Sequence, residues 1–311
     1  MRHGKITIAD LPAVRGKYIA DADMSGLTWF RVGGPADVLF APADAADLAD
    51  FLAATPSSVP VYPVGVGSNL LVRDGGVRGV VVRLGKPFAA IAIDAMTVRA
   101  GAAALDAQVA KAAARAGVAG LEFYRGVPGA IGGAIRMNAG AYGGETKDIL
   151  TSAVAYDRSG ARHELSLSDL GFSYRHCSAP ADFIFTEATF VGEPDEPSAI
   201  EARMASIMSA REDSQPIRER TGGSTFANPD PAVSGGRKTW QLIESVGGRG
   251  RVVGDAQVSE RHCNFMINRG AATAADIETL VEGLRRDVAR ETGVELRWEI
   301  KRIGEFSGEA A

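Results

Sequence analysis

The segment from residue 123 to residue 144 constrains the fold of this chain more than any other, because it holds seven glycines. A connection between two secondary-structure elements needs far fewer. Glycine has no Cβ, so a glycine-rich backbone can be approached closely by a ligand or by another part of the chain. We therefore expect something large and flat to lie against this backbone. The alternative is a glycine-rich turn in a tightly packed core.

A second glycine segment, Gly65-Val66-Gly67-Ser68-Asn69, follows a strand-like run upstream. Its small residues would let backbone N–H groups approach phosphate oxygens, and Ser68 and Asn69 could add side-chain donors. Leu70 stands where a Gly-x-Gly-x-x-Gly dinucleotide fingerprint requires its third glycine, and the chain has no Gly-Lys-Ser/Thr phosphate loop. Alone, the segment is equally well explained as a tight turn. Together with residues 123–144 it indicates a phosphate-bearing cofactor, and the pyrophosphate and ring system of a flavin would fit.

The charge balance argues against a general binder of polyanions, since 34 Lys and Arg face 38 Asp and Glu, giving a formal net charge of −4. The N-terminus lacks an apolar signal region, and no apolar run is long enough to span a bilayer, so the cytoplasm is the expected location. Cys177 and Cys263 lie far apart and the histidines are scattered, so neither a disulfide nor a metal site is expected.

The first half of the chain alternates β-rich runs with alanine-rich helical runs, which predicts α+β layers. Helices are predicted over residues 43–54 and in a segment that stops before Gly117. Their apolar faces consist of Leu48, Phe51 and Leu52 in the first and of Leu105 and Val109 in the second. Strands are predicted over residues 61–66, 77–84, 90–98 and 183–191.

An acidic, proline-containing stretch over residues 191–198 predicts a domain boundary. The helix after it is expected to begin with a capping box formed by Ser198 and Glu201 and to end at Pro216. Its apolar stripe consists of Ile200, Met204, Ile207 and Met208.

A further helix is predicted from Thr273 to Gly293 by five apolar residues at helical spacing: Ile277, Leu280, Val281, Leu284 and Val288. From residue 294 to 300 the apolar residues alternate instead. This pattern predicts a strand with Glu295, Arg297 and Glu299 on its polar face.

Ser224 lies in a glycine-flanked turn, Thr221-Gly222-Gly223-Ser224-Thr225-Phe226, without the Gly-x-Ser-x-Gly elbow of a hydrolase nucleophile. If this serine takes part in chemistry, it is expected to give a proton rather than to attack. A turn serine is the alternative.

Six short motifs follow one another between residues 25 and 304. They are Thr28-Trp29-Phe30-Arg31-Val32-Gly33-Gly34-Pro35-Ala36, Gly67-Ser68-Asn69-Leu70-Leu71, Gly126-Val127-Pro128-Gly129-Ala130-Ile131-Gly132-Gly133, Phe172-Ser173-Tyr174-Arg175, Gly223-Ser224-Thr225-Phe226 and Val258-Ser259-Glu260-Arg261-His262-Cys263-Asn264-Phe265. In this order they resemble the UDP-N-acetylenolpyruvoylglucosamine reductase family of cell-wall synthesis. Two positions depart from the family pattern, because Ala130 replaces a usual Ser or Thr and Ala227 replaces a common Lys.

The resemblance implies an α+β protein with the vanillyl-alcohol-oxidase (PCMH) type of FAD-binding fold, built from two α+β subdomains, plus a separate α+β substrate-binding domain. The length is similar to the shorter branch of the family, which lacks an inserted tyrosine-bearing loop. The expected division is an N-terminal extension (1–24), an FAD-binding domain (25–197), a substrate-binding domain (198–293) and a C-terminal strand and tail (294–311).

The implied cofactors are non-covalent FAD and NADPH as hydride donor. The residues expected to bind FAD are Val64, Gly65, Gly67, Ser68, Asn69, Leu70, Gly126, Pro128, Gly129, Ile131, Gly132, Gly133 and Asn138. Substrate contacts are expected from Arg175, Asn228 and Asn264, with turn-stabilising amides as the alternative for the two asparagines. His262 is expected to make a structural hydrogen bond.

The implied reaction reduces enolpyruvyl-UDP-N-acetylglucosamine to UDP-N-acetylmuramate for peptidoglycan synthesis. Hydride goes to the terminal carbon of the enolpyruvyl group, which leaves negative charge on the adjacent carbon and its carboxylate. Arg175, expected in a strand-like run, would hold that carboxylate through its planar fork. Ser224 would give a proton to the adjacent carbon.

Periodicity does not distinguish Glu295 from Glu299, but the match of Glu299-Ile-Lys-Arg-Ile-Gly304 to the family's terminal motif favours Glu299 as catalytic. A carboxylate facing an anionic substrate would repel it, so the pKa of Glu299 is expected to be raised in the substrate-bound site. Two other functions fit the same residues: a flavin oxidase or dehydrogenase acting on another substrate, and a nucleotide-sugar binding protein without turnover. The expected partner is a UDP-sugar, with no nucleic acid or membrane partner, and the protein is expected to be a monomer or weak oligomer.

Overall fold

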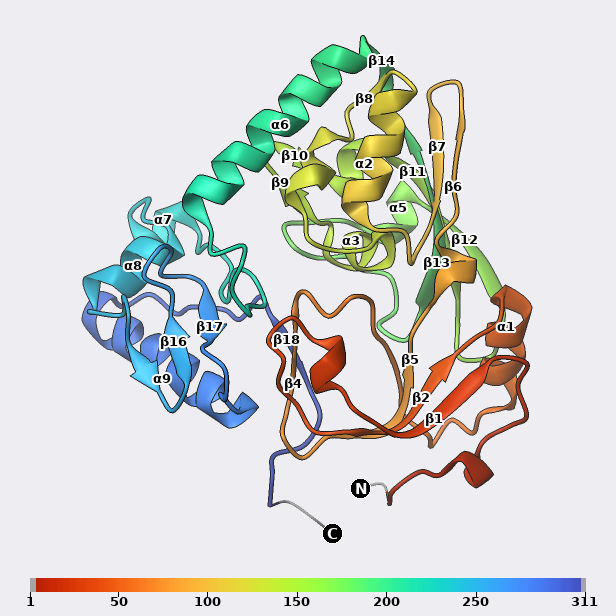
Figure 1. Cartoon of the computed structure of the whole chain (residues 1–311), viewed down its shortest axis with the longest axis horizontal. Coiled ribbons are helices and arrows are strands. Elements are labelled where there is room, and N and C mark those ends of the chain that lie inside the picture. Colours follow the sequence, from red (N-terminus) through yellow and green to blue (C-terminus); the bar gives the residue numbers. More distant parts are fainter. Residues whose placement is uncertain (1–3, 309–311) are drawn as a thin grey trace.

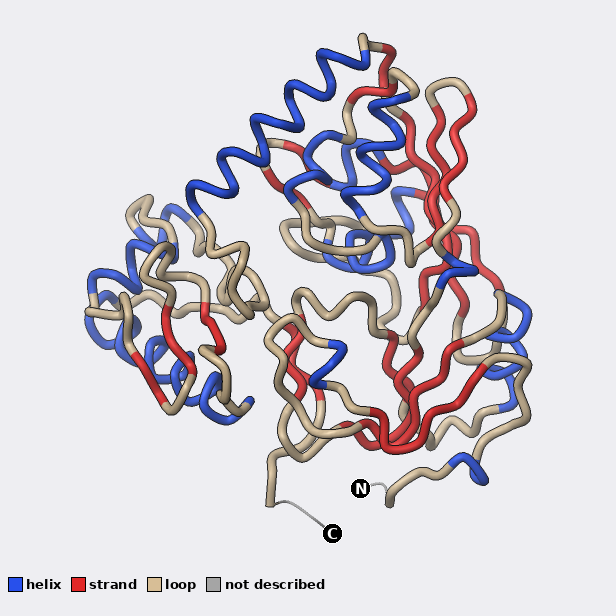
Figure 2. Tube along the Cα trace, in the orientation of Figure 1, coloured by secondary structure: helices blue, strands red, loops and turns tan. Residues whose placement is uncertain are grey.

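The computed structural model describes residues 4–308, which form three packed units (Figure 1). The first two units lie on one side of the molecule, one above the other in Figure 1, and the third lies beside them. The segments that face the middle of the molecule are mainly loops (Figure 2). Function-bearing loops of this kind are typically held in place by the rigid elements around them.

The first unit is built on a four-stranded sheet of order β1-β2-β5-β3. Its strands are β1 (Lys17–Ala22), β2 (Ala36–Ala41), β3 (Val61–Pro63) and β5 (Val77–Val82), and the short turns η1 (Ile8–Asp10), η2 (Ser25–Leu27) and η3 (Lys86–Phe88) flank them. Helix α1 (Ala45–Ala54) buries Leu48, Phe51 and Leu52 as predicted. β1 pairs antiparallel with β2, although it falls within the predicted N-terminal extension.

The second unit is built on a five-stranded antiparallel sheet of order β12-β11-β13-β7-β6. Its strands are β6 (Ile91–Asp94), β7 (Thr97–Gly101), β11 (Leu150–Tyr156), β12 (Arg162–Ser166) and β13 (Ile184–Val191). The predicted single strand over residues 90–98 is wrong. Ala95 has a left-handed φ of 47°, and the turn there folds the segment into the β6–β7 hairpin.

Helices α2 (Asp106–Arg115) and α3 (Ile131–Met137) and the turn η4 (Glu122–Gly126) pack into the core of this second unit. Val109 is buried as predicted, whereas Leu105 precedes helix α2 and is exposed. The smaller elements are β8 (Val118–Ala119), β9 (Gly140–Ala141), β10 (Gly144–Glu145), α4 (Thr146–Ile149), α5 (Leu167–Leu170) and β14 (Glu193–Pro194).

Helix α6 (Pro197–Ser214) runs diagonally from the second unit to the third (Figure 1). Its N-cap is Glu196 and Pro197 occupies its first turn, so the predicted capping box of Ser198 and Glu201 is wrong. Ile200 and Met204 are buried in the core of the second unit. The predicted boundary at residue 198 therefore precedes a helix whose first half packs on the second unit.

The third unit contains α7 (Pro231–Ser234), α8 (Thr239–Ser245), the long α9 (Ala274–Thr292) and a three-stranded sheet of β15 (Val252–Val253), β16 (Ala256–Val258) and β17 (Met266–Asn268). The prediction for α9 is confirmed. Thr273 accepts a hydrogen bond from the Asp276 N–H, and Gly293 ends the helix in a left-handed conformation. All five predicted apolar residues are buried.

The segment after α9 returns to the first unit. Burial alternates along it as predicted, with Val294, Leu296 and Ile300 inside, but within the described residues 294–300 the pairing is limited to one isolated bridge between Trp298 and Phe226. The strand forms later, as β18 (Lys301–Ile303), which pairs in parallel with β4 (Leu70–Val72). Alternation indicates a half-buried extended segment, but a strand also needs a neighbour with free backbone groups.

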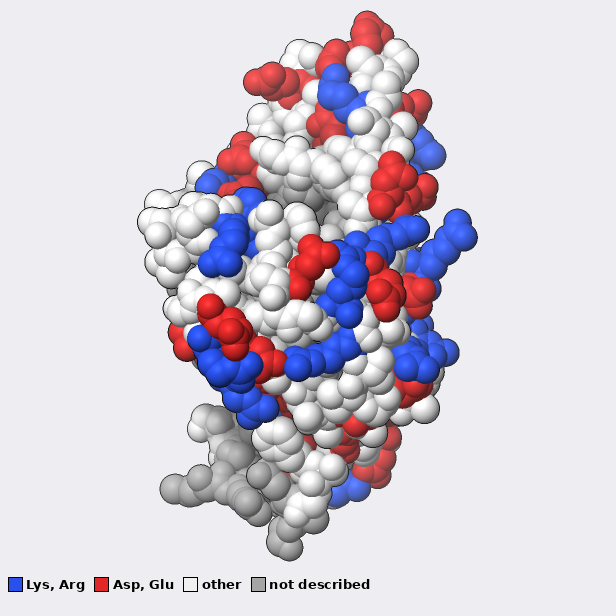
Figure 3. All heavy atoms as spheres, turned by 90° about the vertical axis from the view of Figure 1, so that its left-hand side faces the viewer, with Lys and Arg blue, Asp and Glu red and all other residues white. Residues whose placement is uncertain are grey.

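The charged residues are mixed over the face drawn in Figure 3, where Lys and Arg lie between Asp and Glu. This distribution agrees with the small net charge of −4. Within residues 4–308, no helix combines the length and the apolar character that a membrane span requires.

Candidate active site

The two glycine segments meet in the folded chain. The Asn69 side-chain amide in the first segment lies 2.8 Å from Met137 Sδ at the end of α3, the helix that carries Gly132 and Gly133. Gly67 has a left-handed φ of 68°, and an added Cβ would collide with the Leu27 carbonyl oxygen. Only glycine fits this position without strain.

Two glycines leave bare backbone toward open space. An added Cβ at Gly65 or Gly133 would meet nothing within 4 Å, and both residues are exposed. Backbone of this kind allows a flat group to lie directly against the chain. The site therefore fits the expected flavin, which Gly65 and Gly133 would contact through their backbone.

The other expected FAD residues mostly shape these segments. Val64, Leu70 and Ile131 are buried core residues, while Ser68, Pro128 and Gly132 are half-buried. An added Cβ at Gly126 would lie 2.6 Å from the Tyr142 ring, and one at Gly129 would lie 2.6 Å from Asp106 Oδ2. These two glycines therefore allow close packing within the protein, and their contact with the cofactor stays a prediction.

Asn138 is fully buried and uses its side-chain amide within the protein. Nδ2 donates to the Ser173 carbonyl at 3.1 Å and to Glu145 at 3.0 Å, and Oδ1 accepts from the Lys147 N–H. These bonds tie the end of α3 to the turn that carries Arg175. Asn138 therefore stabilises the turn that carries Arg175. A contact between this side chain and the cofactor stays a prediction.

Arg175 does not lie in a strand. Ser173 and His176 form an isolated bridge with two mutual backbone hydrogen bonds, and Arg175 sits in the turn between them with a left-handed φ of 55°. Such a conformation is uncommon for a residue with a side chain and often marks a functional position. Arg175 Nη2 donates to the Gly140 carbonyl at 2.7 Å.

Glu299 is the partner of Arg175. Arg175 Nε lies 3.2 Å from Glu299 Oε1, but its N–H is not aligned for a hydrogen bond. Burial raises the pKa of Glu299, and the nearby Arg175 guanidinium opposes that shift. Glu295 and Arg297, which share its face of the segment, are exposed. The structure thus separates the two glutamates that periodicity left open, and only Glu299 reaches the site.

Ser224 belongs to a segment whose backbone is bonded to that of Glu299. It forms an isolated bridge with Phe265, and the carbonyl of the next residue, Thr225, accepts the Glu299 N–H at 2.9 Å. The Asn69 amide donates to the Glu299 carbonyl at 3.2 Å. The first glycine segment and the Ser224 segment are therefore both bonded to the backbone of Glu299, the first through the Asn69 side chain and the second through the Thr225 carbonyl.

The two asparagines expected to contact substrate have structural bonds. Asn264 is buried and its side chain bonds both the N–H and the carbonyl of Phe226, at 3.0 and 2.8 Å. Asn228 is exposed, and its Oδ1 accepts the Thr239 N–H at the start of α8. Its side-chain N–H₂ makes no hydrogen bond to residues 4–308 and is available to a ligand. The role of both in substrate binding stays a prediction.

Sequence reasoning missed the support that the stretch after α3 gives to Arg175. The Gly140 carbonyl binds the guanidinium, and Asn138 holds the Ser173 carbonyl. The sequence feature that could have indicated this support is the asparagine directly after a short helix, a position that favours left-handed backbone. Asn138 has a φ of 42°. His262 was expected to make a structural hydrogen bond, and its Nδ1 accepts the Asn264 N–H.

Two family models match this chain. The model described as "FAD binding domain" covers residues 36–166, and the one described as "UDP-N-acetylenolpyruvoylglucosamine reductase, C-terminal domain" covers residues 215–303. The first contains both glycine segments, and the second contains Ser224 and Glu299. The predicted vanillyl-alcohol-oxidase type of FAD-binding fold is confirmed by this match together with the structural comparison below.

Similar proteins match over nearly their whole length. The UDP-N-acetylenolpyruvoylglucosamine reductases of Azorhizobium caulinodans and Maricaulis maris are 61% and 58% identical, over 95% and 97% of this chain and 94% and 96% of their own. The crystal structure of UDP-N-acetylenolpyruvylglucosamine reductase (MurB) from Thermus caldophilus is 33% identical, with a TM-score of 0.79 over 94% of this chain and 100% of its own. By sequence and by fold, the chain belongs to the UDP-N-acetylenolpyruvoylglucosamine reductase family.

Proposed function

We propose that this chain reduces enolpyruvyl-UDP-N-acetylglucosamine to UDP-N-acetylmuramate, a step of peptidoglycan precursor synthesis, with FAD and NADPH. Membership of the family supports the reaction. The ion pair of Arg175 and Glu299, placed beside the two glycine segments, is the observation that supports the assignment of residues.

Bound FAD would take hydride from NADPH and supply it to the terminal carbon of the enolpyruvyl group. The residues of the chain must then bind the substrate's carboxylate and manage the charge that develops next to it. Arg175 is suited to the first task, because its guanidinium is half-buried and is held in place by the Gly140 carbonyl. Within residues 4–308 its buried Nε–H has no hydrogen-bond partner, so it can donate to a further anionic group.

Glu299 balances the charge of Arg175 in the absence of substrate. Once the substrate's carboxylate binds the guanidinium, two anions compete for one cation, and a carboxyl group with a raised pKa can take up a proton instead. Ser224 is assigned the proton transfer to the carbon next to the carboxylate. A hydroxyl is a weak acid, but the carbanionic carbon is strongly basic and the distance to it is fixed by binding.

The other parts of the proposal concern partners and location. The substrate is a UDP-sugar, and we propose a cytoplasmic protein without nucleic acid or membrane partners, present as a monomer or weak oligomer. The mixed surface charge supports the proposal that the protein has no nucleic acid partner.

The Ser224→Ala variant tests the proton transfer. FAD-loaded protein is first reduced with NADPH under anaerobic conditions, and reoxidation of the flavin by enolpyruvyl-UDP-N-acetylglucosamine is followed by its absorbance. We expect reoxidation to slow by about 10²–10⁴-fold, while reduction by NADPH is unchanged, because general acid catalysis contributes about that factor. Ser159→Ala, in an exposed turn, is the control.

Unchanged reoxidation in Ser224→Ala would remove the serine from the mechanism. Wild-type protein that is reduced by NADPH but is reoxidised only by oxygen would instead identify a flavin oxidase. Protein that binds the UDP-sugar without any reoxidation would identify a binding protein.

A further inference from the structure

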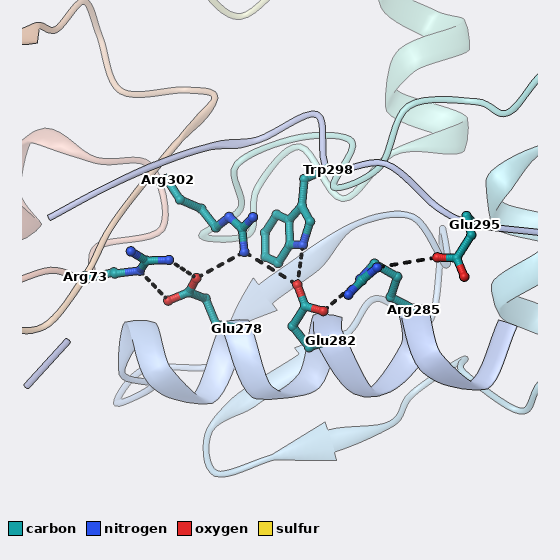
Figure 4. Close-up of polar contacts among 7 residues, drawn as sticks. All are labelled: Arg73, Glu278, Glu282, Arg285, Glu295, Trp298 and Arg302. Carbon is teal, nitrogen blue, oxygen red and sulfur yellow. Dashed lines mark hydrogen bonds and ion pairs between the residues drawn. The ribbon is translucent and has the colours of Figure 1, made fainter. Parts of the chain in front are cut away.

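The backbone segment that carries Glu299 is held from its other face by two glutamates of α9 (Figure 4). Glu278 and Glu282 are one helical turn apart, so their side chains point to the same side of the helix. Trp298 and Arg302 lie above them, one residue before and three residues after Glu299. Glu299 is thus bracketed by two contacts to α9.

The contacts divide into two groups. Glu278 binds Arg73 of the first unit through two bonds, at 3.0 and 3.1 Å, and so joins the third unit to the first. Glu282 accepts the Trp298 Nε1–H at 2.7 Å and pairs with Arg285 at 2.7 Å. Glu282 therefore holds the residue next to Glu299, and its longer contact with Arg302 Nη1, at 3.5 Å, also reaches β18 on the first unit.

Two further side chains pack around the indole ring of Trp298. The Arg302 guanidinium lies 4.2 Å from the ring centre, and the Phe226 ring lies 5.9 Å away. Phe226 is two residues from Ser224, so the same indole contacts the segments of both proposed catalytic residues. Side chains of neighbouring residues in an extended segment point to opposite faces. An indole fixed on the α9 side therefore fixes the direction of the Glu299 side chain toward Arg175.

We propose that Glu282 is a positioning residue for Glu299, acting through the indole of Trp298. This inference rests on the proposed function, in which Glu299 acts together with Arg175. The hydrogen bonds of the Glu299 backbone to Thr225 and Asn69 fix where the segment lies. The bond between Glu282 and Trp298 fixes how the segment is turned about its own axis, and so which way the Glu299 side chain points.

The experiment compares Glu282→Ala with Glu282→Gln in the FAD-loaded enzyme. Glutamine keeps an oxygen that can accept the indole N–H, whereas alanine does not. Misplacement of a reacting group by about 1 Å can cost about 100-fold in rate. We expect flavin reoxidation by enolpyruvyl-UDP-N-acetylglucosamine to slow at least about 10-fold in Glu282→Ala and by less than about 3-fold in Glu282→Gln, with reduction by NADPH unchanged in both. Glu295→Ala is the control, since Glu295 is the exposed outer end of the same network.

A combined variant separates positioning from a general loss of structure. In a Glu299→Gln background, Glu282→Ala should slow reoxidation no further, because a residue that acts through Glu299 has nothing left to position. A second, independent slowing of similar size in the combined variant would overturn the proposal. So would a Glu282→Gln variant as slow as Glu282→Ala.

Carboxyl-labelled glutamate gives a readout that does not depend on turnover. The Glu299 carbon resonance, assigned by its loss in Glu299→Gln, should shift in Glu282→Ala and keep its wild-type position in Glu282→Gln and Glu295→Ala. A resonance unmoved in Glu282→Ala would overturn the proposal. If wild-type flavin is not reoxidised by the UDP-sugar, the proposed function fails, and the resonance still decides whether Glu282 positions Glu299.

Discussion

Two buried carboxyl groups, Glu299 and Asp106, have opposite environments in this molecule. The Glu299 side chain is 14% exposed and lies 3.2 Å from an arginine, whereas Asp106 is 0% exposed and neither of its carboxyl oxygens has a hydrogen-bond partner among the described residues. Burial raises the pKa of both, but only Glu299 has a cation that opposes the shift. A cation beside a buried carboxyl partly offsets the rise of its pKa, while burial without a partner favours the neutral form.

The two groups also differ in what surrounds them. Glu299 comes from an extended segment between units, among loops, and faces Arg175 with Arg297 and Lys301 nearby. Asp106 is the first residue of α2 in the core of the second unit, directly behind Gly129 of the second glycine segment. A strongly raised pKa therefore does not by itself identify the catalytic acid. Access to a ligand and a charged partner must be present as well.

The largest expected effect comes from removing the cation that distinguishes the two groups. Arg175→Met should lower the rate of flavin reoxidation by about 10²–10³-fold at neutral pH, because truncating one partner of a buried charge pair costs about 2–5 kcal/mol. Since Arg175 lowers the pKa of Glu299, the pKa should rise further in the variant, which makes Glu299 resemble Asp106. Stopped-flow absorbance across a pH series measures both changes. Arg297→Met, at an exposed position on the same face, should stay near wild type.

Asp106→Asn should change how stability depends on pH. The folded pKa of Asp106 lies well above the ordinary value of 3.8, so the folded state holds a proton that the unfolded state releases. The contribution of Asp106 to the free energy of unfolding is therefore fully present below pH 3.8 and falls as the pH rises toward the folded pKa, by about 1.4 kcal/mol per pH unit. Asparagine does not titrate and should remove this contribution.

Urea unfolding of FAD-saturated protein at several pH values between 5 and 8 provides the measurement. The difference in unfolding free energy between Asp106→Asn and wild type should grow in favour of the variant as the pH rises. A difference that is constant over this range would show that the folded pKa of Asp106 does not lie within or above it. The size of the difference at any single pH is not informative, because the asparagine amide is itself unpaired there.

The smallest expected effect concerns the glycine behind Asp106. Gly129→Ala would place a Cβ 2.6 Å from Asp106 Oδ2 and should lower the free energy of unfolding by about 1–3 kcal/mol. Asp106→Ala in the same protein should recover part of that loss, since it removes the atom that clashes. Additive losses in the double variant would contradict the contact. Gly133→Ala, where an added Cβ meets nothing within 4 Å, should keep its stability but bind FAD more weakly.

Local signals in the sequence predicted those parts of the fold that local contacts determine. Helix α9 has its cap at Thr273, its stop at Gly293 and its apolar stripe within one stretch, and all three are confirmed. The strand over residues 90–98 failed because a single left-handed residue, Ala95, makes a hairpin without the glycine or asparagine that usually marks such a turn. The strand after α9 failed at its boundary because its partner lies in another unit.

The candidate site could be predicted only through the resemblance of several motifs in order. No local pattern places Arg175 beside Glu299, since the two are brought together by a turn, an isolated bridge and a strand pairing over long range. Nor could the sequence predict that Asp106 is buried without a hydrogen-bond partner among the described residues. An aspartate at the start of a helix is usually solvated and interacts favourably with the helix dipole.

The pairing of β18 with β4 has a consequence for synthesis on the ribosome. In the structure, β4 has β18 as its ladder partner, yet more than two hundred residues separate the two in the chain. At translation rates of about 5–20 residues per second, residues 70–72 wait roughly ten to fifty seconds for residues 301–303 to appear. During this time a nascent chain carries an apolar strand with unpaired backbone next to its glycine loop, a stretch that chaperones could recognise. Glu299 is synthesised just before the same late strand. A newly made chain therefore acquires this carboxylate and covers the unpaired edge of β4 at the same stage.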